Sequence, residues 1–328
     1  MSRTNRIVPF ALALLLHPSI APAADTPSSA NAAKEGVRIT QLSDRLRIEI
    51  QGELFSEYYY QSVSRPFLYP ILGPGGLAMT RNWPMKEVEN EERDHPHHRS
   101  LWFAHGDANG HDFWSEGSKA GKTVHDKFIQ VKSDPKQGVI KSANKWVALD
   151  GTVVATDERT LRIFNLTQER LFDFEITIHA SHGDLVLGDT KEGTMAIRLA
   201  ETMRLKGKVG QGHIVNSEGV RDGETWGKRA KWVDYYGPVN GTIVGVAIFD
   251  HPANPRHPTW WHVRDYGLFA ANPFGVHDFE KQPAGTGNLT VQAGQSVTFR
   301  YRFYLHAGDE KQADVAGHYQ DYVAKPAR

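Results

Sequence analysis

Six of the sixteen histidines of this sequence fall between residues 95 and 125, in a stretch that also carries aspartates and an arginine. The segment from 93 to 114 reads RDHPHHRSLWFAHGDANGHDFW. Imidazole can take up and release a proton near neutral pH, and a neighbouring carboxylate can orient it. Such groups are costly to bury unless they pair with one another or with a ligand. The segment is therefore predicted to form a site rather than a piece of core.

Three histidines of the sequence are candidates for proton transfer, and nearby aspartates are candidate orienting groups or partner bases. These candidate catalytic residues are His98, His105, His262, Asp94 and Asp107. One alternative is that His95 and His97 bind a divalent metal, because imidazole and carboxylate suit Zn, Mn, Fe or Ni. The His-Pro-His-His spacing matches no standard metal motif, however. Another alternative is that these imidazoles only hydrogen-bond Asp94 and the backbone to hold the loop.

A second segment, DHPANPRHPTWWHVR at 250–264, has the same character. Three prolines stiffen its first half, and in the extended second half Trp260, His262 and Arg264 are predicted to share one face, opposite Trp261 and Val263. Indole rings stack on the C–H face of a sugar, and guanidinium binds hydroxyl or carboxylate groups. A polyol or a carboxylated sugar is the ligand that this surface suits.

The substrate-binding candidates come from both segments and from GLFAANPFG at 267–275. They are Arg99, Trp102, Asn109, Asp112, Trp114, Asn254, Arg256, His257, Trp260, Arg264 and Asn272. For the tryptophans, packing in the core is an equally good interpretation. A further polar face is expected on the strand near the C-terminus, formed by Arg300, Arg302, Tyr304 and His306. Arg65 to Tyr69 is interpreted as a strand entering a sheet, and 221–231 as a solvated loop.

The elements that position these residues are predicted to be strands. Apolar and polar residues alternate over 45–50, 171–179 and 297–306, and shorter β-branched or alternating runs occupy 147–155, 160–166, 195–199 and 242–249. A short strand at 101–103 would fix the loops on either side of it. Helical spacing is found at 309–324. The fold class is therefore all-β, a large antiparallel two-sheet β-sandwich with a short C-terminal helix, and residues 36–328 are predicted to form one domain.

The N-terminal residues have the pattern of a targeting signal. Arg3 and Arg6 precede an apolar run over 7–16, which is too short to span a bilayer, and Ala21-Pro22-Ala23 offers small residues for cleavage. We expect a signal peptide over 1–23 and a flexible tether over 24–35. No later segment has the apolar length of a membrane span, so a periplasmic or secreted product is expected.

Composition narrows the classes of function. The 38 basic residues equal the 38 acidic ones in 328 residues, so no net positive charge is available for nucleic acid. There is no cysteine, which excludes disulfides, thiolate nucleophiles and Cys-ligated metals. The sequence contains no Gly-rich dinucleotide fingerprint and no phosphate loop, so no cofactor is indicated apart from the metal alternative.

Three blocks of the sequence carry a resemblance to a known family. The sequence resembles exported bacterial proteins labelled "methane oxygenase PmoA", a family without an established function. The resemblance is carried by DHPHHRSLWFAHGD with the following NG and DFW, by HP with NPRHPTWWHVR, and by GLFAANPFG. The resemblance extends from RPFLYP at 65–70 to the His306 strand. It implies a β-sandwich protein of carbohydrate-degrading bacteria, distantly similar to the galactose mutarotase superfamily and its supersandwich. A true methane monooxygenase subunit is a bundle of transmembrane helices, which this sequence lacks, so that activity is excluded.

The leading hypothesis is a carbohydrate-active enzyme that acts on a sugar or sugar-derived substrate by His/carboxylate acid–base chemistry, as an epimerase, lyase or hydrolase. The alternative is a non-catalytic glycan-binding protein, and the third hypothesis is a metal-dependent enzyme. In each case the expected partner is a small-molecule or oligosaccharide ligand, with no nucleic acid.

Overall fold

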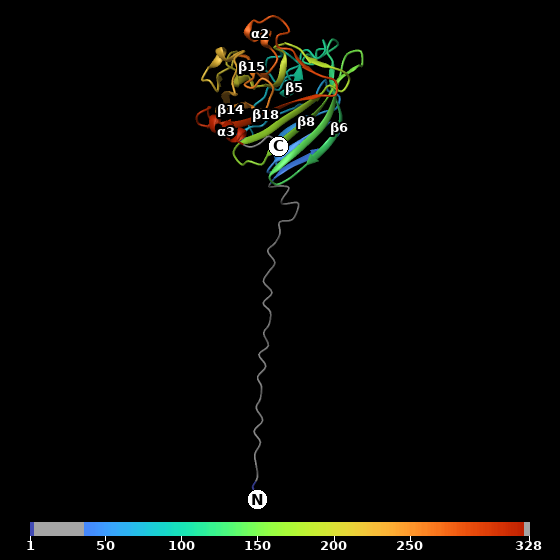
Figure 1. The fold of residues 1–328 in the computed structure, drawn as a ribbon. Coiled ribbons are helices and arrows are strands. Elements are labelled where there is room, and N and C mark those ends of the chain that lie inside the picture. Colours follow the sequence, from blue (N-terminus) through green and yellow to red (C-terminus); the bar gives the residue numbers. More distant parts are fainter. Residues whose placement is uncertain (3–35, 325–328) are drawn as a thin grey trace.

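Alternation of apolar and polar residues builds the strands of this protein. The computed structural model describes residues 1–2 and 36–324, so the expected signal peptide and tether lie almost wholly outside the described residues (Figure 1). In β9 (Arg170–His179), Phe172, Phe174 and the two following isoleucines at alternate positions are buried, whereas the residues between them are partly exposed. Phe172 stacks on Phe303 of β18 (Ser296–Ala307) with ring centroids 4.7 Å apart.

The described strands form two eight-stranded antiparallel sheets and one two-stranded sheet. Sheet 1 has the order β1 (Val37–Gln41), β2 (Arg45–Ile50), β3 (Glu53–Tyr59), β4 (Phe67–Leu68), β5 (Leu101–His105), β11 (Gly193–Arg198), β16 (Leu268–Asn272) and β15 (Trp260–Val263). Sheet 2 has the order β12 (His213–Asn216), β13 (Trp232–Val239), β14 (Thr242–Asp250), β18, β9, β8 (Val153–Phe164), β7 (Gln137–Val147) and β6 (Lys122–Lys132). The small sheet pairs β10 (Leu185–Leu187) with β17 (Leu289–Val291).

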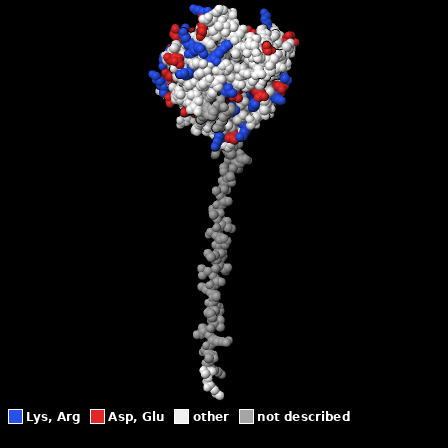
Figure 2. All heavy atoms as spheres, viewed as in Figure 1, with Lys and Arg blue, Asp and Glu red and all other residues white. Residues whose placement is uncertain are grey.

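The main core lies between the two large sheets. Phe55 of sheet 1 packs against Phe172 of sheet 2, and Phe103 packs against Phe174, with ring centroids 5.7 and 6.4 Å apart. Each large apolar side chain buried in this way contributes about 1.5–3 kcal/mol relative to an exposed one. The predicted two-sheet sandwich with a short C-terminal helix is confirmed. Basic and acidic side chains are both spread over the face in Figure 2.

Helices are few and short among the described residues. They are α2 (Val276–Glu280), α3 (Val315–Val323) and the 3₁₀ turns η1 (Pro74–Gly76), η2 (Glu201–Met203) and η3 (Asp222–Thr225). α3 lies against sheet 2 (Figure 1), where Tyr319 meets Phe249 edge to face. No described helix has the length and apolarity that a membrane crossing requires.

Two predicted boundaries differ from the structure. The helix expected over 309–324 begins only after Asp314, whose side chain accepts a hydrogen bond from the Gly317 amide. The residues before it form a turn, because the Asp309 side chain accepts hydrogen bonds from the amides of Lys311 and Gln312. The run expected over 147–155 is two strand ends, β7 and β8, joined by a turn. Asp150 accepts from the Thr152 amide and Gly151 has a φ of 88°, which an Asp-Gly turn permits.

A buried ion pair in sheet 2 makes stability depend on pH. His306 Nε2 lies 3.0 Å from Asp234 Oδ1, and neither side chain is more than 1% exposed. Burial lowers the pKa of His306, but the charge and hydrogen bond of Asp234 raise it further, so the net pKa is raised. The folded state therefore holds this proton more tightly than the unfolded chain, whose histidine has a pKa near 6.5.

The stabilisation from His306 should be complete below about pH 6.5 and should be lost as the pH rises through the raised pKa. We expect the unfolding free energy to fall by up to about 1.4 kcal/mol per pH unit in that window. Urea unfolding at pH 6, 7, 8 and 9 measures it, and His306→Gln should remove the slope. The exposed His182→Gln is the control, and an unchanged slope in His306→Gln would contradict the assignment.

Candidate functional site

The outer face of sheet 1, turned away from sheet 2, carries residues of both sequence segments. In β5, Leu101 and Phe103 enter the main core, whereas Trp102 and Ala104 belong to a separate apolar cluster on the outer face. The strand register aligns a row across β4, β5, β11, β16 and β15, which consists of Phe67, Trp102, Ala196, Ala270 and His262. Every residue of this row is at most 3% exposed, so the loops that carry the polar groups cover it.

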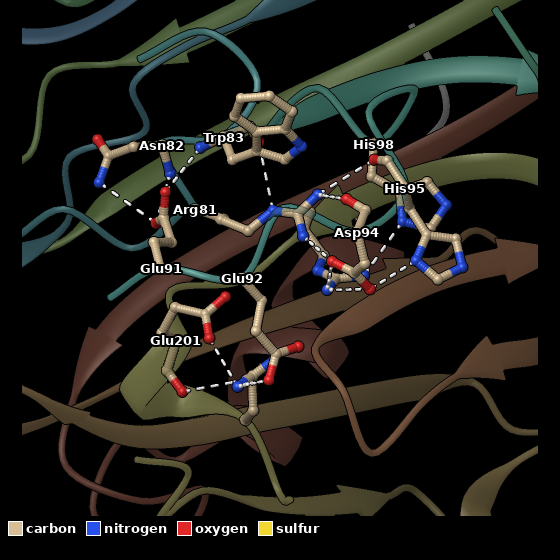
Figure 3. A network of polar contacts seen from close by, with 11 residues as sticks. Arg81, Asn82, Trp83, Glu91, Glu92, Asp94, His95, His98 and Glu201 are labelled. Carbon is tan, nitrogen blue, oxygen red and sulfur yellow. Dashed lines mark hydrogen bonds and ion pairs between the residues drawn. The ribbon is translucent and has the colours of Figure 1, made fainter. Parts of the chain in front are cut away.

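Asp94 accepts hydrogen bonds from three side chains, those of Arg81, His95 and Arg198 (Figure 3). Arg198 Nη2 lies 2.9 and 3.1 Å from its two carboxylate oxygens, His95 Nδ1 lies 2.5 Å from Oδ2, and Arg81 Nη1 also donates to Oδ1. Burial alone would raise the pKa of Asp94, but the His95 hydrogen bond and the two guanidinium charges hold it well below its usual range. Asp94 is therefore ionised at neutral pH.

This arrangement selects the tautomer of His95. An ionised carboxylate only accepts hydrogen bonds, so His95 Nδ1 carries the proton and Nε2 keeps a free lone pair. The His95 side chain is 40% exposed, whereas those of Arg81 and Arg198 are fully buried. His95 can thus take up a proton at Nε2 while Asp94 stabilises the imidazolium that forms.

Two arginine side chains hold the backbone of the loop that carries His95. Arg81 Nη2 donates to the carbonyls of Asp94 and His95 at 3.0 and 3.1 Å, and Arg65 Nη1 donates to the His97 carbonyl at 3.0 Å. His95 itself has a φ of 43°, and the His98 amide closes the turn onto the His95 carbonyl at 3.0 Å. Two buried arginines therefore fix the position of the His95 imidazole.

The two neighbouring histidines differ from His95. The His98 ring is stacked between His95 and Trp102, and its Nδ1 accepts from Arg198 Nη1 at 3.2 Å. Burial, followed by the charges of neighbouring His97 and Arg198, holds the pKa of His98 far below its usual range. Burial also lowers the pKa of His97, to about 4. Of the three, His95 alone combines exposure with a carboxylate partner.

Glu192 is a carboxyl group whose pKa is influenced by the charge of His95. Its side chain is 40% exposed, and burial raises its pKa, while nearby Lys191 and the more distant His95 act in the opposite direction. Asn272 Nδ2 fixes the segment by donating to the carbonyls of Thr190 and Lys191 at 3.0 and 2.9 Å. Gly106 allows the close approach, since a Cβ there would lie 2.8 Å from that of Glu192. Glu192 therefore holds its proton to a higher pH than an exposed glutamate does, and His95 is one of the charges that act on it.

The second half of the 250–264 segment also lies on the outer face. Trp261 and Val263 enter the main core, so Trp260, His262 and Arg264 share the opposite face as predicted. Trp260 Nε1 donates to Glu280 at 2.8 Å. Burial lowers the pKa of His262 to about 3. His262 is therefore neutral at pH 7.

Tyr266 joins the two segments. The His95 ring is stacked on Tyr266 with centroids 5.3 Å apart, and the guanidinium carbons of Arg198 and Arg264 lie 4.7 and 5.5 Å from the same ring. Residues 94–98 and the end of β15 therefore meet on one face of sheet 1.

The first half of the 250–264 segment uses its polar groups to hold its own loop. Asn254 Nδ2 donates to Asp250 and to the Arg300 carbonyl at 2.7 and 2.8 Å, and His257 Nδ1 lies 2.7 Å from Asp250. Arg256 donates to three backbone carbonyls, those of Pro273, Gly287 and Asn288. Asn254, Arg256 and His257 thus bind the protein itself, and we do not assign them to a ligand.

Several other predicted residues also bind the protein. Asp107 accepts from the Gly110 amide, Asn109 pairs with Asp184 and Val186, and Asp112 accepts from the amides of Trp114 and Ser115. His105 lies on the core side of β5 beside Phe274, and burial lowers its pKa to about 4. Trp102 and Trp114 are about 1% exposed and pack together with centroids 5.2 Å apart.

Arg99 lies at the side of the outer face. It makes a bidentate contact with Glu116, with N–O distances of 2.8 to 3.0 Å, and its guanidinium carbon lies 5.6 Å from the Phe67 ring centroid. Arg99 and Glu116 line a pocket of about 580 Å³ together with Ser62, Ser64 and Lys122. Most of the residues that line the pocket are polar or charged, and its arginine is already paired with Glu116.

The described residues contain no group of three or more histidine, aspartate or glutamate side chains that could hold a metal ion. His95 and His97, the predicted metal ligands, have ring centroids 5.7 Å apart at an angle of 71°. His95 Nδ1 is instead occupied by Asp94. The chemistry proposed below therefore uses protein side chains alone.

Sequence reasoning missed four residues of this site, Arg81, Glu192, Arg198 and Tyr266. Arg198 had a signal: it stands in the apolar run 195–199, and a charge in a buried strand requires a partner. Glu192 and Tyr266 stand in polar connections with nothing local to distinguish them from solvated residues.

Comparisons with known proteins place the chain in a family. The sequence profile of a family of unknown function, DUF6807, matches residues 45–320. A search of curated proteins found no match. Among solved structures, a galactose mutarotase-related enzyme from Lactobacillus acidophilus is similar, with 9% identity and a TM-score of 0.28 over 82% of this chain and 97% of that one. A TM-score of 0.28 is too low to support any statement about the function of this chain. Neither the family description nor the name of the similar structure contains the methane oxygenase label.

Proposed function

Because the chain belongs to DUF6807, a family of unknown function, its membership assigns no activity, and we propose from the site that it is an acid–base enzyme acting on a sugar or sugar-derived ligand. The observation that carries the proposal is the Asp94–His95 dyad, and Glu192, whose pKa is raised, is the acid that we propose to act with it. One group is ready to accept a proton and the other retains one to a higher pH than an ordinary glutamate.

The reaction that suits this pair is a transfer of protons at a sugar's anomeric centre. His95 Nε2 takes the proton of the anomeric hydroxyl, the bond between the anomeric carbon and the ring oxygen breaks, and Glu192 protonates that oxygen. Reversal of these steps after rotation of the carbonyl closes the ring with the other configuration. The two proton transfers balance, so no cofactor is consumed.

Aromatic side chains around the dyad support a sugar as the ligand. His95, His98, Tyr266 and Trp102 form a continuous set of ring contacts, and the indole nitrogens of Trp102 and Trp114 are buried without a hydrogen-bond partner among the described residues. Trp102 and His98 are about 1% exposed, so His95 and Tyr266 are the members of this set that a sugar can contact, and aromatic rings stack on the C–H faces of sugars.

His95→Gln and Glu192→Gln should each lower turnover by at least about 100-fold, because general acid–base groups contribute about 10²–10⁴. The measurement is anomer exchange followed by proton NMR over a panel of aldoses and hexuronates. Unfolding in urea should be nearly unchanged, since His95 and Glu192 are partly exposed.

Glu158→Gln, which breaks an exposed pair with Lys141 on sheet 2, is the matched control and should keep full activity. Turnover that persists in both site variants would remove His95 and Glu192 from catalysis. Sugars that bind by calorimetry but are never turned over by the unaltered protein would instead support the glycan-binding alternative.

A further inference from the structure

Arg264 is an unpaired cation on the outer face of sheet 1. Its guanidinium makes no ion pair and no hydrogen bond with the residues that the structure describes, and the residue is only partly exposed. Its guanidinium carbon lies 5.8 Å from the Trp226 ring centroid and 5.5 Å from that of Tyr266. Two aromatic rings thus hold the charge in place while its N–H donors are left for another partner.

The other arginines near the site are already engaged. Arg81 and Arg198 donate to Asp94, Arg204 donates to Glu92, and Arg65 donates to backbone carbonyls. A guanidinium that merely filled space would be expected to have a similar partner, because charge-assisted hydrogen bonds are the strongest ones available to it. Arg264 differs from these four, although it faces the same Tyr266 ring as Arg198 and His95.

Two further groups beside Arg264 have no partner within the described part of the chain. His262 Nδ1 and Trp226 Nε1 are both buried without a hydrogen bond, and their rings lie 6.3 Å apart. His262 as a whole is only 3% exposed. A buried polar atom without a partner calls for an explanation, and a polar ligand at Arg264 would supply one.

We infer that Arg264 binds the carboxylate of an acidic sugar, so that the substrate class of this site is a hexuronate or a similar carboxylated sugar rather than a neutral one. The inference rests on the proposed function, because it places the sugar against the His95 dyad. Arg264 and His95 lie 5.5 and 5.3 Å from the centroid of the same Tyr266 ring, which places both groups next to one residue of the site.

The charges at the site favour a carboxylate over a phosphate. The planar guanidinium matches a carboxylate in two parallel hydrogen bonds, and one unpaired positive charge balances one negative charge. Lys191, the neighbouring cation, already lies 3.6 Å from Asp278. A phosphate monoester would bring nearly two negative charges to a single free cation.

The test compares the binding of glucuronate, galacturonate, glucose, galactose and glucose 6-phosphate by calorimetry. We expect the uronates to bind at least about ten-fold more tightly than the hexoses, as a charge-assisted bidentate pair implies. Arg264→Gln should weaken uronate binding about 10- to 100-fold and leave hexose binding nearly unchanged, while Arg264→Lys should restore part of the loss. Arg162→Gln on β8, another arginine without an ion pair among the described residues, is the matched control.

Each outcome bears on one claim. Equal binding of uronates and hexoses, a preference that survives Arg264→Gln, tighter binding of the sugar phosphate, or no binding of any probe would overturn the inference. Uronates that bind through Arg264 without turnover would support it and overturn the proposed catalysis. Turnover of hexoses without a preference for uronates would support the proposed catalysis and overturn the inference about Arg264.

Discussion

Between pH 6.5 and 4.5 the protein should lose most of its stability, because four histidines are buried in a neutral state. These are His97, His98, His105 and His262, and burial is the first cause of the lowered pKa of each. In the unfolded chain each has a pKa near 6.5 and binds a proton as the pH falls. The unfolded state then holds more protons than the folded one, so acid favours unfolding.

The expected loss is comparable to the whole stability of a domain. The pKa is lowered to about 4 for His97 and His105 and to about 3 for His262. Each such group costs up to about 1.4 kcal/mol per pH unit below 6.5, so these three together cost about 6–8 kcal/mol by pH 4.5, allowing for the partial exposure of His97. Typical domains are stable by about 5–15 kcal/mol.

Urea unfolding at pH 7, 6, 5 and 4.5 measures this loss, and the points down to pH 5 lie above most of the titration of ordinary carboxylates. His262→Gln should remove one proton from the uptake and so reduce the slope of unfolding free energy against pH. The exposed His182→Gln should leave the slope as it is. A flat profile down to pH 4.5 would mean that these imidazoles are charged in the folded protein.

Local sequence patterns were sufficient for most of the strands. In β9 and β2, alternation alone located each element almost to the residue, because one face of each strand is buried against the opposite sheet. The pattern was less informative at 147–155, where β-branched residues on both sides of Asp150-Gly151 concealed a turn. Helix length was overestimated because residues 309–314 form turns before α3.

The site was predictable only in part, since its contacts join distant residues. The two histidine-rich segments do meet on one face, at Tyr266, but the pairing of Asp94 with Arg198 spans 104 residues and depends on the register of β5 and β11. No local pattern reveals that register. The sequence also could not show that Arg256 binds backbone carbonyls whereas the Arg264 guanidinium does not. A charged residue in a loop has the same sequence signature in both roles.

Asp94 has two roles, since its carboxylate pairs with two buried arginines and also hydrogen-bonds the proposed base, His95. Arg81 and Arg198 are fully buried, and both donate to this carboxylate. Burial, together with the charge of Arg81, lowers the pKa of Arg198 to about 10, which reflects how costly this charge is to enclose. Without Asp94 the two guanidiniums would face each other with no counterion in the immediate contact.

Asp94→Asn should reduce the unfolding free energy by about 2–4 kcal/mol, less than the full value for a buried pair because Asp94 is 33% exposed. Urea unfolding at pH 7 measures the loss. Adding Arg198→Met should recover part of it, since one unpaired buried charge is removed with its partner. Glu87→Gln, which breaks the exposed pair with Arg93, is the control and should cost under about 1 kcal/mol.

The same variant separates the two roles of Asp94. At 25 °C and without urea, Asp94→Asn should remain folded, because the expected loss is smaller than the stability of a typical domain. Its turnover should nevertheless fall, since an amide cannot stabilise the imidazolium of His95 as a carboxylate does. A stability equal to that of Glu87→Gln would show that Arg81 and Arg198 do not depend on this carboxylate for charge balance. Full turnover in folded Asp94→Asn would show that His95 acts without an orienting carboxylate.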